Sequence, residues 1–283
     1  MTPLTTATRA GVVRGLIETR QMLTNGMDLF SQYFWPILVL VALYFMRDGH
    51  FQETGIGLGS LALPGVLGML VASSGLLGIS QFLAVDREDG TLLRAKATPH
   101  GMAGYLVGKI VTVTSTVLLQ VLLVLILGQL IVGGLDLGRP TAWLTLIWVF
   151  ALGMLATLPM GAVFGSLFEN PRTIGFVSFP IMGLIAISGI FYPITSLPGW
   201  VQGIAQVFPI YWLGLGMRSA LLPADAAVVE LGQSWRHWET LGVLAAWTVV
   251  GLLIAPIVLR RMARRESGSR VAARREKAMQ RAY

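Results

Sequence analysis

The stretch LALPGVLGMLVASSGLLGISQFL, residues 61–83, decides the fold, because it runs for 23 residues without one charged side chain. Its apolar residues do not alternate strictly with polar ones, so a half-buried strand is excluded. A bilayer core about 30 Å thick needs about 20 apolar helical residues, since backbone amides in lipid are satisfied only within a helix or a closed barrel. We therefore predict that Leu61 to Leu83 forms a membrane-spanning helix.

Five further apolar stretches place the chain among all-α polytopic membrane proteins. Only 12% of its 283 residues are charged and 54% are hydrophobic, whereas roughly 25% are charged in a soluble domain. We predict one membrane domain, residues 29–259, and no separate soluble domain. Its six transmembrane helices are predicted at Leu29–Met46, Leu61–Leu83, Ile110–Val132, Ala142–Phe168, Ile174–Phe191 and Thr240–Leu259. The first span lacks a small-residue cleavage site, so we expect it to stay in the membrane.

The basic residues predict the orientation of these spans. Alternate sides of the predicted spans carry 17 and 4 Lys and Arg residues, and nine of them lie in the tail, residues 260–283. Cytoplasmic loops near the membrane hold the positive excess. We therefore expect a multi-pass protein of the cell membrane with both termini in the cytoplasm. The tail directly follows a helix end, so we expect it to contact anionic lipid headgroups and not nucleic acid.

Residues 1–28 predict a cytoplasmic amphipathic helix. Its apolar residues can share one helical face, opposite a polar face, and such a helix lies on a membrane surface. Two roles stay open for this helix: it is a simple juxtamembrane anchor, or it braces a cytoplasmic partner. The apolar residues are Val13, Leu16, Ile17, Leu23 and Met27, and the polar ones are Arg14, Glu18, Gln21 and Asn25.

A second irregular region precedes the last span. No charged residue occurs from Thr173 to Met217, and these 45 residues are far more than one crossing requires. Prolines and a glycine interrupt the stretch, so we predict a short re-entrant helical pair on the outer side, within residues 192–218. The aromatic residues of this side suit an interfacial belt or a role in closing an exit path, and both readings are open.

The most informative loop is VDREDGTLLRAKATPHGMAGYLVGK, residues 85–109. It is too charged for lipid. Gly90 is expected to end the second span, Thr91 to Ala97 to form a short helix, and Thr98 to cap the next helix with Pro99 as its first residue. A short helix held between two spans can transmit force, while an ordinary solvated turn is the alternative.

The sequence lacks the motifs that several kinds of activity require. The phosphate-binding pattern GxxxxGK[ST] is missing, since Ala103 replaces its first glycine and Ile110 its hydroxyl residue. The three histidines are scattered without metal-ligand spacing, and Ser188 lacks the setting of a membrane protease nucleophile. No acid or base lies inside the apolar runs, which disfavours ion-driven transport. We expect no catalytic residue, no metal and no cofactor in this chain.

Three motifs stand out in this chain. The first motif comprises Arg87, Glu88, Gly90, Thr91, Leu92, Arg94, Thr98, Pro99, Gly108 and Lys109; the second Ser188, Gly189, Phe191, Pro193, Leu197, Pro198, Gly199 and Trp200; the third Asn170 and Pro171. These motifs resemble those of the membrane subunits of ATP-binding-cassette exporters of the type 2 permease family, which export drugs, antibiotics and polysaccharides. The similarity covers nearly the whole chain. This chain departs at Asp89 and at Ala95 to Ala97, where other residue types are frequent.

The resemblance implies a permease that faces a second permease, identical or homologous, with an ATP-binding subunit on each cytoplasmic loop. ATP and magnesium would then be held by that partner. The implied coupling residues are Asp86, Arg87, Glu88, Asp89, Gly90, Thr91, Leu92, Leu93, Arg94, Thr98 and Pro99. The implied extracellular gate consists of Phe191, Tyr192, Pro193, Leu197, Pro198, Gly199 and Trp200.

The resemblance thus implies a subunit for efflux of a hydrophobic or amphipathic substrate, whether drug, antibiotic, lipid or glycan, as in multidrug resistance. The substrate path is expected along the first, second and fifth spans. The alternative is a membrane scaffold that recruits a cytoplasmic partner without transport. A lipid-modifying enzyme would need convergent polar residues at one membrane depth, and the sequence shows none. The GxxxG pair Gly161 and Gly165 permits close helix packing, either internally or at a dimer face.

Overall fold

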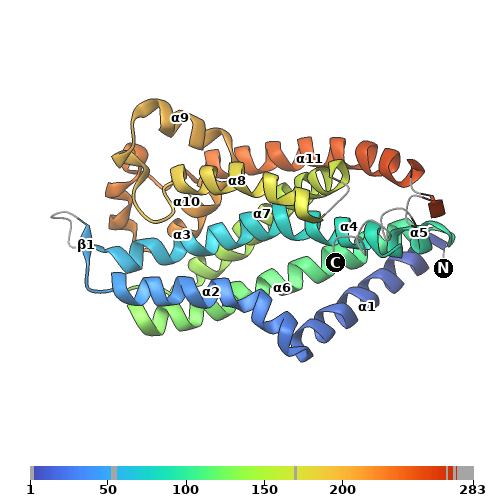
Figure 1. The fold of residues 1–283 in the computed structure, drawn as a ribbon. Coiled ribbons are helices and arrows are strands. Elements are labelled where there is room, and N and C mark those ends of the chain that lie inside the picture. The colour runs from blue at the N-terminus through green and yellow to red at the C-terminus, as the bar shows by residue number, and fades with distance from the viewer. Residues whose placement is uncertain (1–2, 52–55, 169–170, 266, 270–271, 273–283) are drawn as a thin grey trace.

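The computed structural model describes residues 3–51, 56–168, 171–265, 267–269 and 272, and it shows an elongated bundle of helices (Figure 1). The tail and Asn170 lie largely or wholly outside this part of the chain. A π-helical segment, Ser74–Gly78, joins α3 to α4, and a two-residue antiparallel pair, β1 (His50–Phe51) and β2 (Ile56–Gly57), precedes α3. The helices are α1 Pro3–Thr24, α2 Gly26–Met46, α3 Leu58–Ser73, α4 Ile79–Glu88, α5 Thr91–Lys96, α6 Gly101–Val132, α7 Pro140–Leu167, α8 Pro171–Ile187, α9 Gly199–Val207, α10 Pro209–Leu221 and α11 His237–Arg265.

Five helical segments of the described chain are long and apolar enough to cross a membrane, which confirms a multi-pass membrane protein. They are α2, the continuous path Leu58–Glu88, α6, α7 and α11. The predicted span Ile174–Phe191 corresponds to α8, which ends at Ile187 and has 17 residues. A helix of that length reaches only about 25 Å, so a sixth crossing stays a prediction.

The centre of the bundle is formed by α3 and α10. From Leu61 to Ala72 every residue of α3 is buried, and so is nearly every residue of α10. The two helices approach closely because Gly68 has no side chain. A Cβ atom added there would clash, since it would lie 2.6 Å from the backbone nitrogen of Gly214. The middle of α3 is therefore enclosed within one copy of the chain. A substrate path along this part of the second span, as the sequence suggested, would need the bundle to open.

α9 and α10 form a helical hairpin whose tip lies beside the first half of α11. The indole of Trp247, ten residues after the start of α11, donates a hydrogen bond to the Val207 carbonyl at the tip (2.8 Å). The other end of α10 lies beside the α6–α7 loop, where Asp136 N donates to the Leu221 carbonyl (2.8 Å). In Figure 1 both helices lie at the end of the bundle that carries β1.

The N-terminal helix is shorter than expected and its faces are used differently. α1 ends at Thr24, and the Asn25 side chain accepts a hydrogen bond from Met27 N (3.0 Å), which caps α2. Met27 therefore belongs to α2. The apolar residues Leu16 and Ile17 point away from the bundle and are exposed. The opposite face of α1 packs along the first half of α6 (Figure 1).

Glycines make the α1–α6 contact possible. A Cβ atom added at Gly15 would lie 2.6 Å from the Gly108 carbonyl oxygen and 2.7 Å from the Val111 Cβ atom. Gly11 faces Gly104 in the same way, one helical turn earlier. These two GxxxG pairs bring the backbones together, as small residues do in membrane helix packing. The sequence reading had singled out neither pair.

The predicted GxxxG pair in α7 also serves internal packing. The Ser80 hydroxyl of α4 lies 2.6 Å from the Gly161 carbonyl oxygen. A Cβ atom at Gly165 would lie 2.7 Å from the Ser80 Cα atom. The structure thus places this pair against α4 of the same chain.

The glycine contact between α1 and α6 generates a stability prediction. Gly15→Ala should lower the stability by ~1–3 kcal/mol, because the added methyl group overpacks a closed interface. Gly183→Ala is the matched control, since nothing lies within 4 Å of its Cβ position and alanine favours a helix. The measurement is thermal unfolding in detergent; equal midpoints for the two variants would contradict the close contact.

Candidate functional site

The loop between the second and third spans folds into a short helix at one end of the bundle. Gly90 has φ +79°, which favours glycine, and it ends α4; α5 follows directly. The Asp89 Oδ1 atom accepts a hydrogen bond from Thr91 N (2.7 Å). The break at Gly90 and the short helix are as the sequence predicts. α5 lies at the same end as the start of α1 and the end of α11 (Figure 1).

The predicted cap at Thr98 is wrong. The Thr98 hydroxyl donates to the Ala95 carbonyl (3.0 Å), and Gly101 N donates to the Thr98 carbonyl (3.0 Å). These bonds form a further turn after α5, so α6 begins at Gly101 and not at Pro99. His100 precedes α6 with φ +56°.

Two of the predicted coupling residues point into the protein. Asp86 is 7% exposed and Arg87 is 4% exposed. The Arg87 Nη1 atom donates to the carbonyls of Ser166 (3.3 Å) and Phe168 (3.1 Å), where α7 ends. A cation is favourable at a helix C-terminus, where carbonyls lack helical partners. Arg87 therefore joins α4 to α7.

The remaining coupling residues divide between the surface and the base of α5. Arg94 is exposed, and its Nη2 atom donates to the Thr91 hydroxyl (2.9 Å). Leu92 is only 1% exposed and anchors the helix. The exposed members of the predicted set are Asp89, Arg94, Thr98 and Pro99; Glu88, Thr91 and Leu93 are half-buried, and Gly90 is buried. A partner could therefore meet one face of α5 and the turn after it.

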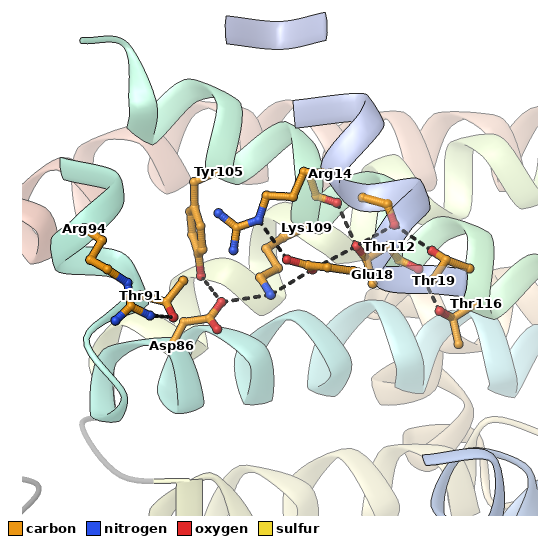
Figure 2. Close-up of polar contacts among 12 residues, drawn as sticks. Arg14, Glu18, Thr19, Asp86, Thr91, Arg94, Tyr105, Lys109, Thr112 and Thr116 are labelled. Atoms are coloured by element: carbon orange, nitrogen blue, oxygen red, sulfur yellow. Dashed lines mark hydrogen bonds and ion pairs between the residues drawn. The ribbon is translucent and has the colours of Figure 1, made fainter. Parts of the chain in front are cut away.

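Behind α5, a buried lysine lies between two carboxylates (Figure 2). The Lys109 Nζ atom is 3.0 Å from Asp86 Oδ2 and 3.0 Å from Glu18 Oε2, and the lysine side chain is 6% exposed. The Tyr105 hydroxyl also donates to Asp86 Oδ2 (2.7 Å). Asp86 comes from α4, Lys109 from α6 and Glu18 from α1, so one ammonium group joins three helices.

The α1 side of this cluster adds a second cation. Arg14 Nε lies 2.8 Å from Glu18 Oε1, and the Thr112 hydroxyl donates to Glu18 Oε2 (3.2 Å). Burial alone would raise the pKa of Glu18, but the hydrogen bonds and charges of Arg14 and Lys109 outweigh it and hold this pKa below its ordinary value. Two cations thus balance two carboxylates. We call Arg14, Glu18, Asp86, Tyr105 and Lys109 the ion cluster.

Sequence reasoning missed the ion cluster. Lys109 was noticed only within a family motif, while Arg14 and Glu18 were assigned to a polar helix face. The available signal was a lysine next to an apolar run, which requires a nearby acid because unpaired charge is costly there. Hydropathy alone could not choose the acid, since Glu18 lies 91 residues away in the chain.

The predicted gate residues lie at the opposite end of the bundle, beside a buried ion pair. Arg218 Nε lies 2.6 Å from Glu230 Oε1, and both side chains are 1% exposed. Arg218 Nη1 donates to the Gly189 carbonyl (2.9 Å), which fixes the chain just after α8. Phe191 and Tyr192 follow, half-buried, and Trp200 is 72% exposed on α9. Pro193 is buried, Leu197 is half-buried, and Pro198 and Gly199 are exposed.

The two predicted sets therefore do not form one site. α5 and α9 lie near opposite ends of the molecule in Figure 1. Within the described residues, no group of three His, Cys, Asp or Glu side chains could hold a metal ion.

The ion cluster predicts a large effect of removing its central charge. Lys109→Met should lower the stability by ~3–5 kcal/mol, because it leaves two carboxylates buried without their shared cation. Arg20→Met, at an exposed position of α1, is the control and should leave the unfolding midpoint nearly unchanged. Thermal unfolding in detergent measures both. A Lys109→Met protein as stable as the control would mean that the cluster does not hold the helices together.

The lowered pKa of Glu18 predicts a dependence on pH. A carboxyl group with a depressed folded-state pKa adds stability above its unfolded value of 4.5, and that stability is lost as the pH falls through the folded value. The unsubstituted protein should therefore exceed Glu18→Gln in stability at pH 7, and the difference should shrink below pH 4.5. Unfolding midpoints at several pH values test this; a constant difference would exclude the ionised carboxylate as its source.

A search of the curated proteins found no match to this chain. One family model matches residues 43–257, from the end of α2 to most of α11, and its description is "ABC-2 family transporter protein". The matched part includes α5, Asp86 and Lys109 but not α1. The chain belongs to the ABC-2 family of transporter membrane proteins.

Proposed function

We propose that this chain is the permease subunit of an ATP-driven exporter and that an ATP-binding subunit docks on α5. The observation that carries the proposal is the position of α5 at the end of the bundle, directly between α4 and α6, with the ion cluster behind it. Membership of the ABC-2 family implies an ABC ATP-binding partner. The chain has no phosphate-binding loop of its own, so energy would come from that partner.

The contacts explain how a push on α5 would spread. α4 ends at Glu88 and α5 begins at Thr91, so little chain is available to absorb a displacement. The Asp86–Lys109 pair connects α4 to α6, and Lys109–Glu18 connects α6 to α1. Movement of α5 would therefore displace three helices together. This mechanical role requires no catalytic residue in the permease.

The proposal places the α5 end of the bundle in the cytoplasm, following the excess of Lys and Arg on that side. The exposed residues Val13, Leu16 and Ile17 of α1 would then contact the lipid interface. α9 and α10 would form the re-entrant pair on the outer side, since the tip of their hairpin reaches Trp247 and then returns. The predicted gate would lie where this hairpin meets the end of α8.

The exposed apolar side chains of α2 and α8 support pairing with a second permease. α2 exposes Phe30, Phe34 and Phe45, and α8 exposes Phe176 and Phe179. Large exposed apolar patches mark membrane or protein contacts. We propose that the second permease covers part of this surface and that the substrate passes between the two. An apolar path suits a hydrophobic or amphipathic drug, antibiotic, lipid or glycan.

Reconstitution tests the proposed function. The permease and its co-expressed ATP-binding subunit are placed in vesicles, with ethidium and a fluorescent phospholipid as transport probes. Glu88→Gln/Arg94→Gln should reduce ATP-dependent transport and probe-stimulated ATP hydrolysis about tenfold, a loss near 1.4 kcal/mol of coupling. Both residues lie on or beside α5, whereas the control Arg47→Gln removes an exposed arginine that directly follows α2, just before β1.

The outcomes separate the alternatives. Transport that is lost in the double variant and retained in Arg47→Gln supports coupling through α5. Unchanged coupling in the double variant contradicts the assigned role of the loop. Binding of the ATP-binding subunit without transport of any probe would instead favour a recruiting scaffold.

A further inference from the structure

The second span contains an irregular segment near its middle. The helical path Leu58–Glu88 is α-helical on both sides of Ser74–Gly78, where the chain forms a π-helical turn. Such turns are rare and occur mostly as single insertions within α-helices, frequently at functional sites. This one lies between the half of the span that is buried against α10 and the half that leads to α5.

The two halves of the span differ in their main neighbours, although both also contact α6 and α7. The outer half, α3, packs closely on α10 at Gly68 and Gly214. The inner half, α4, bonds to α7 through Ser80 and to α6 through Asp86. The π-helical turn therefore separates a part fixed to the outer hairpin from a part fixed to the ion cluster.

The neighbouring helix α7 contains a proline at this level. Gly75 of the π-helical turn packs against Thr157 of α7, which is followed by Pro159. Proline lacks a backbone N–H group, so Pro159 leaves the Leu155 carbonyl without its usual helical donor. On the far side of α7, a Cβ atom at Gly251 of α11 would lie 2.9 Å from Pro159 Cβ.

A glutamine of α6 connects the same level to α2. Pro36 removes the helical donor for the Gln32 carbonyl, and the Gln120 Nε2 atom donates to that carbonyl instead (2.9 Å). Gln120 Oε1 also lies 3.5 Å from the Ser74 hydroxyl at the start of the π-helical turn. Gln120 is 4% exposed, so this connection is inside the bundle.

α6 itself runs unbroken through this level. It extends for 32 residues from Gly101 to Val132 without a proline. α2 and α7 contain interior prolines, and the second span contains the π-helical turn. Around the π-helical turn, α2, α7 and the second span thus each carry a helix-weakening feature, whereas α6 carries none there.

We propose that Ser74–Gly78, with Pro159 of α7 and the Gln120 connection to α2, is a hinge between an inner and an outer half of the permease. The inner half carries α1, α4, α5 and the ion cluster, and the outer half carries α3 and the α9–α10 hairpin. The hinge rests on the proposed function, since it would convert displacement of α5 into opening at the outer end. It adds to that function the place where the bundle bends.

The experiment replaces a glycine of the hinge by alanine at a position where the added methyl group causes no clash. A Cβ atom at Gly78 meets only Val113 Cγ1 at 3.7 Å, an ordinary contact, and alanine reduces backbone freedom. Gly78→Ala should therefore fold and bind the ATP-binding subunit but reduce ATP-dependent ethidium transport severalfold. Gly242→Ala is the matched control, because nothing lies within 4 Å of its Cβ position in α11. Pro159→Ala, which restores a helical donor in α7, should act in the same direction.

A distance measurement gives the decisive readout. The chain contains no cysteine, so spin labels can be placed at Lys96→Cys on α5 and Thr195→Cys at the outer end. Nucleotide trapping of the complex should change the distance between the labels, and Gly78→Ala should reduce that change to less than half. An undiminished change in both Gly78→Ala and Pro159→Ala would overturn the hinge and leave the proposed function standing. No change in the unsubstituted complex would overturn both.

Discussion

A buried charged side chain must be paired, and this requirement determines the end of the bundle that carries α5. Lys109 lies within α6, directly before the apolar sequence that begins at Ile110, and its side chain is almost completely buried. An isolated ammonium group in that position would be costly. Asp86 and Glu18 each approach it to 3.0 Å, so the pairing requirement brings α4 and α1 to α6.

The consequences extend to the position of α5. Asp86 is held by both Lys109 and Tyr105, and Arg87 beside it binds the end of α7. The last turn of α4 is therefore fixed, and Gly90 then redirects the chain into α5 at the end of the bundle. The family match begins within α2, so the attachment of α1 through Glu18 is known for this chain from its structure alone. If an ATP-binding subunit docks on α5 as proposed, a helix with this support can transmit displacement without deforming first.

The sequence predicted the parts that follow from local rules. Spans follow from the length of apolar runs, and α2, α6, α7 and α11 were each located with only the ends uncertain. Gly90 was recognised as a helix end because its conformation is a property of glycine. Thr98 was misassigned, since its hydroxyl has a choice of partners and the competing Ala95 carbonyl lies on the preceding turn. Such a choice depends on packing and not on residue type.

Parts that depend on distant residues could not be predicted. Asp86 and Arg87 looked like surface charges of a loop, yet their partners are Lys109, Ser166 and Phe168. The same holds for Arg218, whose carbonyl partner Gly189 lies 29 residues earlier. The length of α8 was overestimated because the apolar pattern continues past Ile187, whereas the helix ends there and Gly189 turns the chain with φ +62°. A hydropathy profile does not report where an apolar chain turns.

The central claim is that α1 and α5 move as one unit through the ion cluster. Spin labels at Arg9→Cys on α1 and Lys96→Cys on α5, in the otherwise cysteine-free chain, measure this directly in the complex with the ATP-binding subunit. The account predicts that this distance stays the same between the nucleotide-free and nucleotide-trapped states, while Lys109→Met makes it vary. A clear change of the α1–α5 distance in the unsubstituted protein would contradict the account.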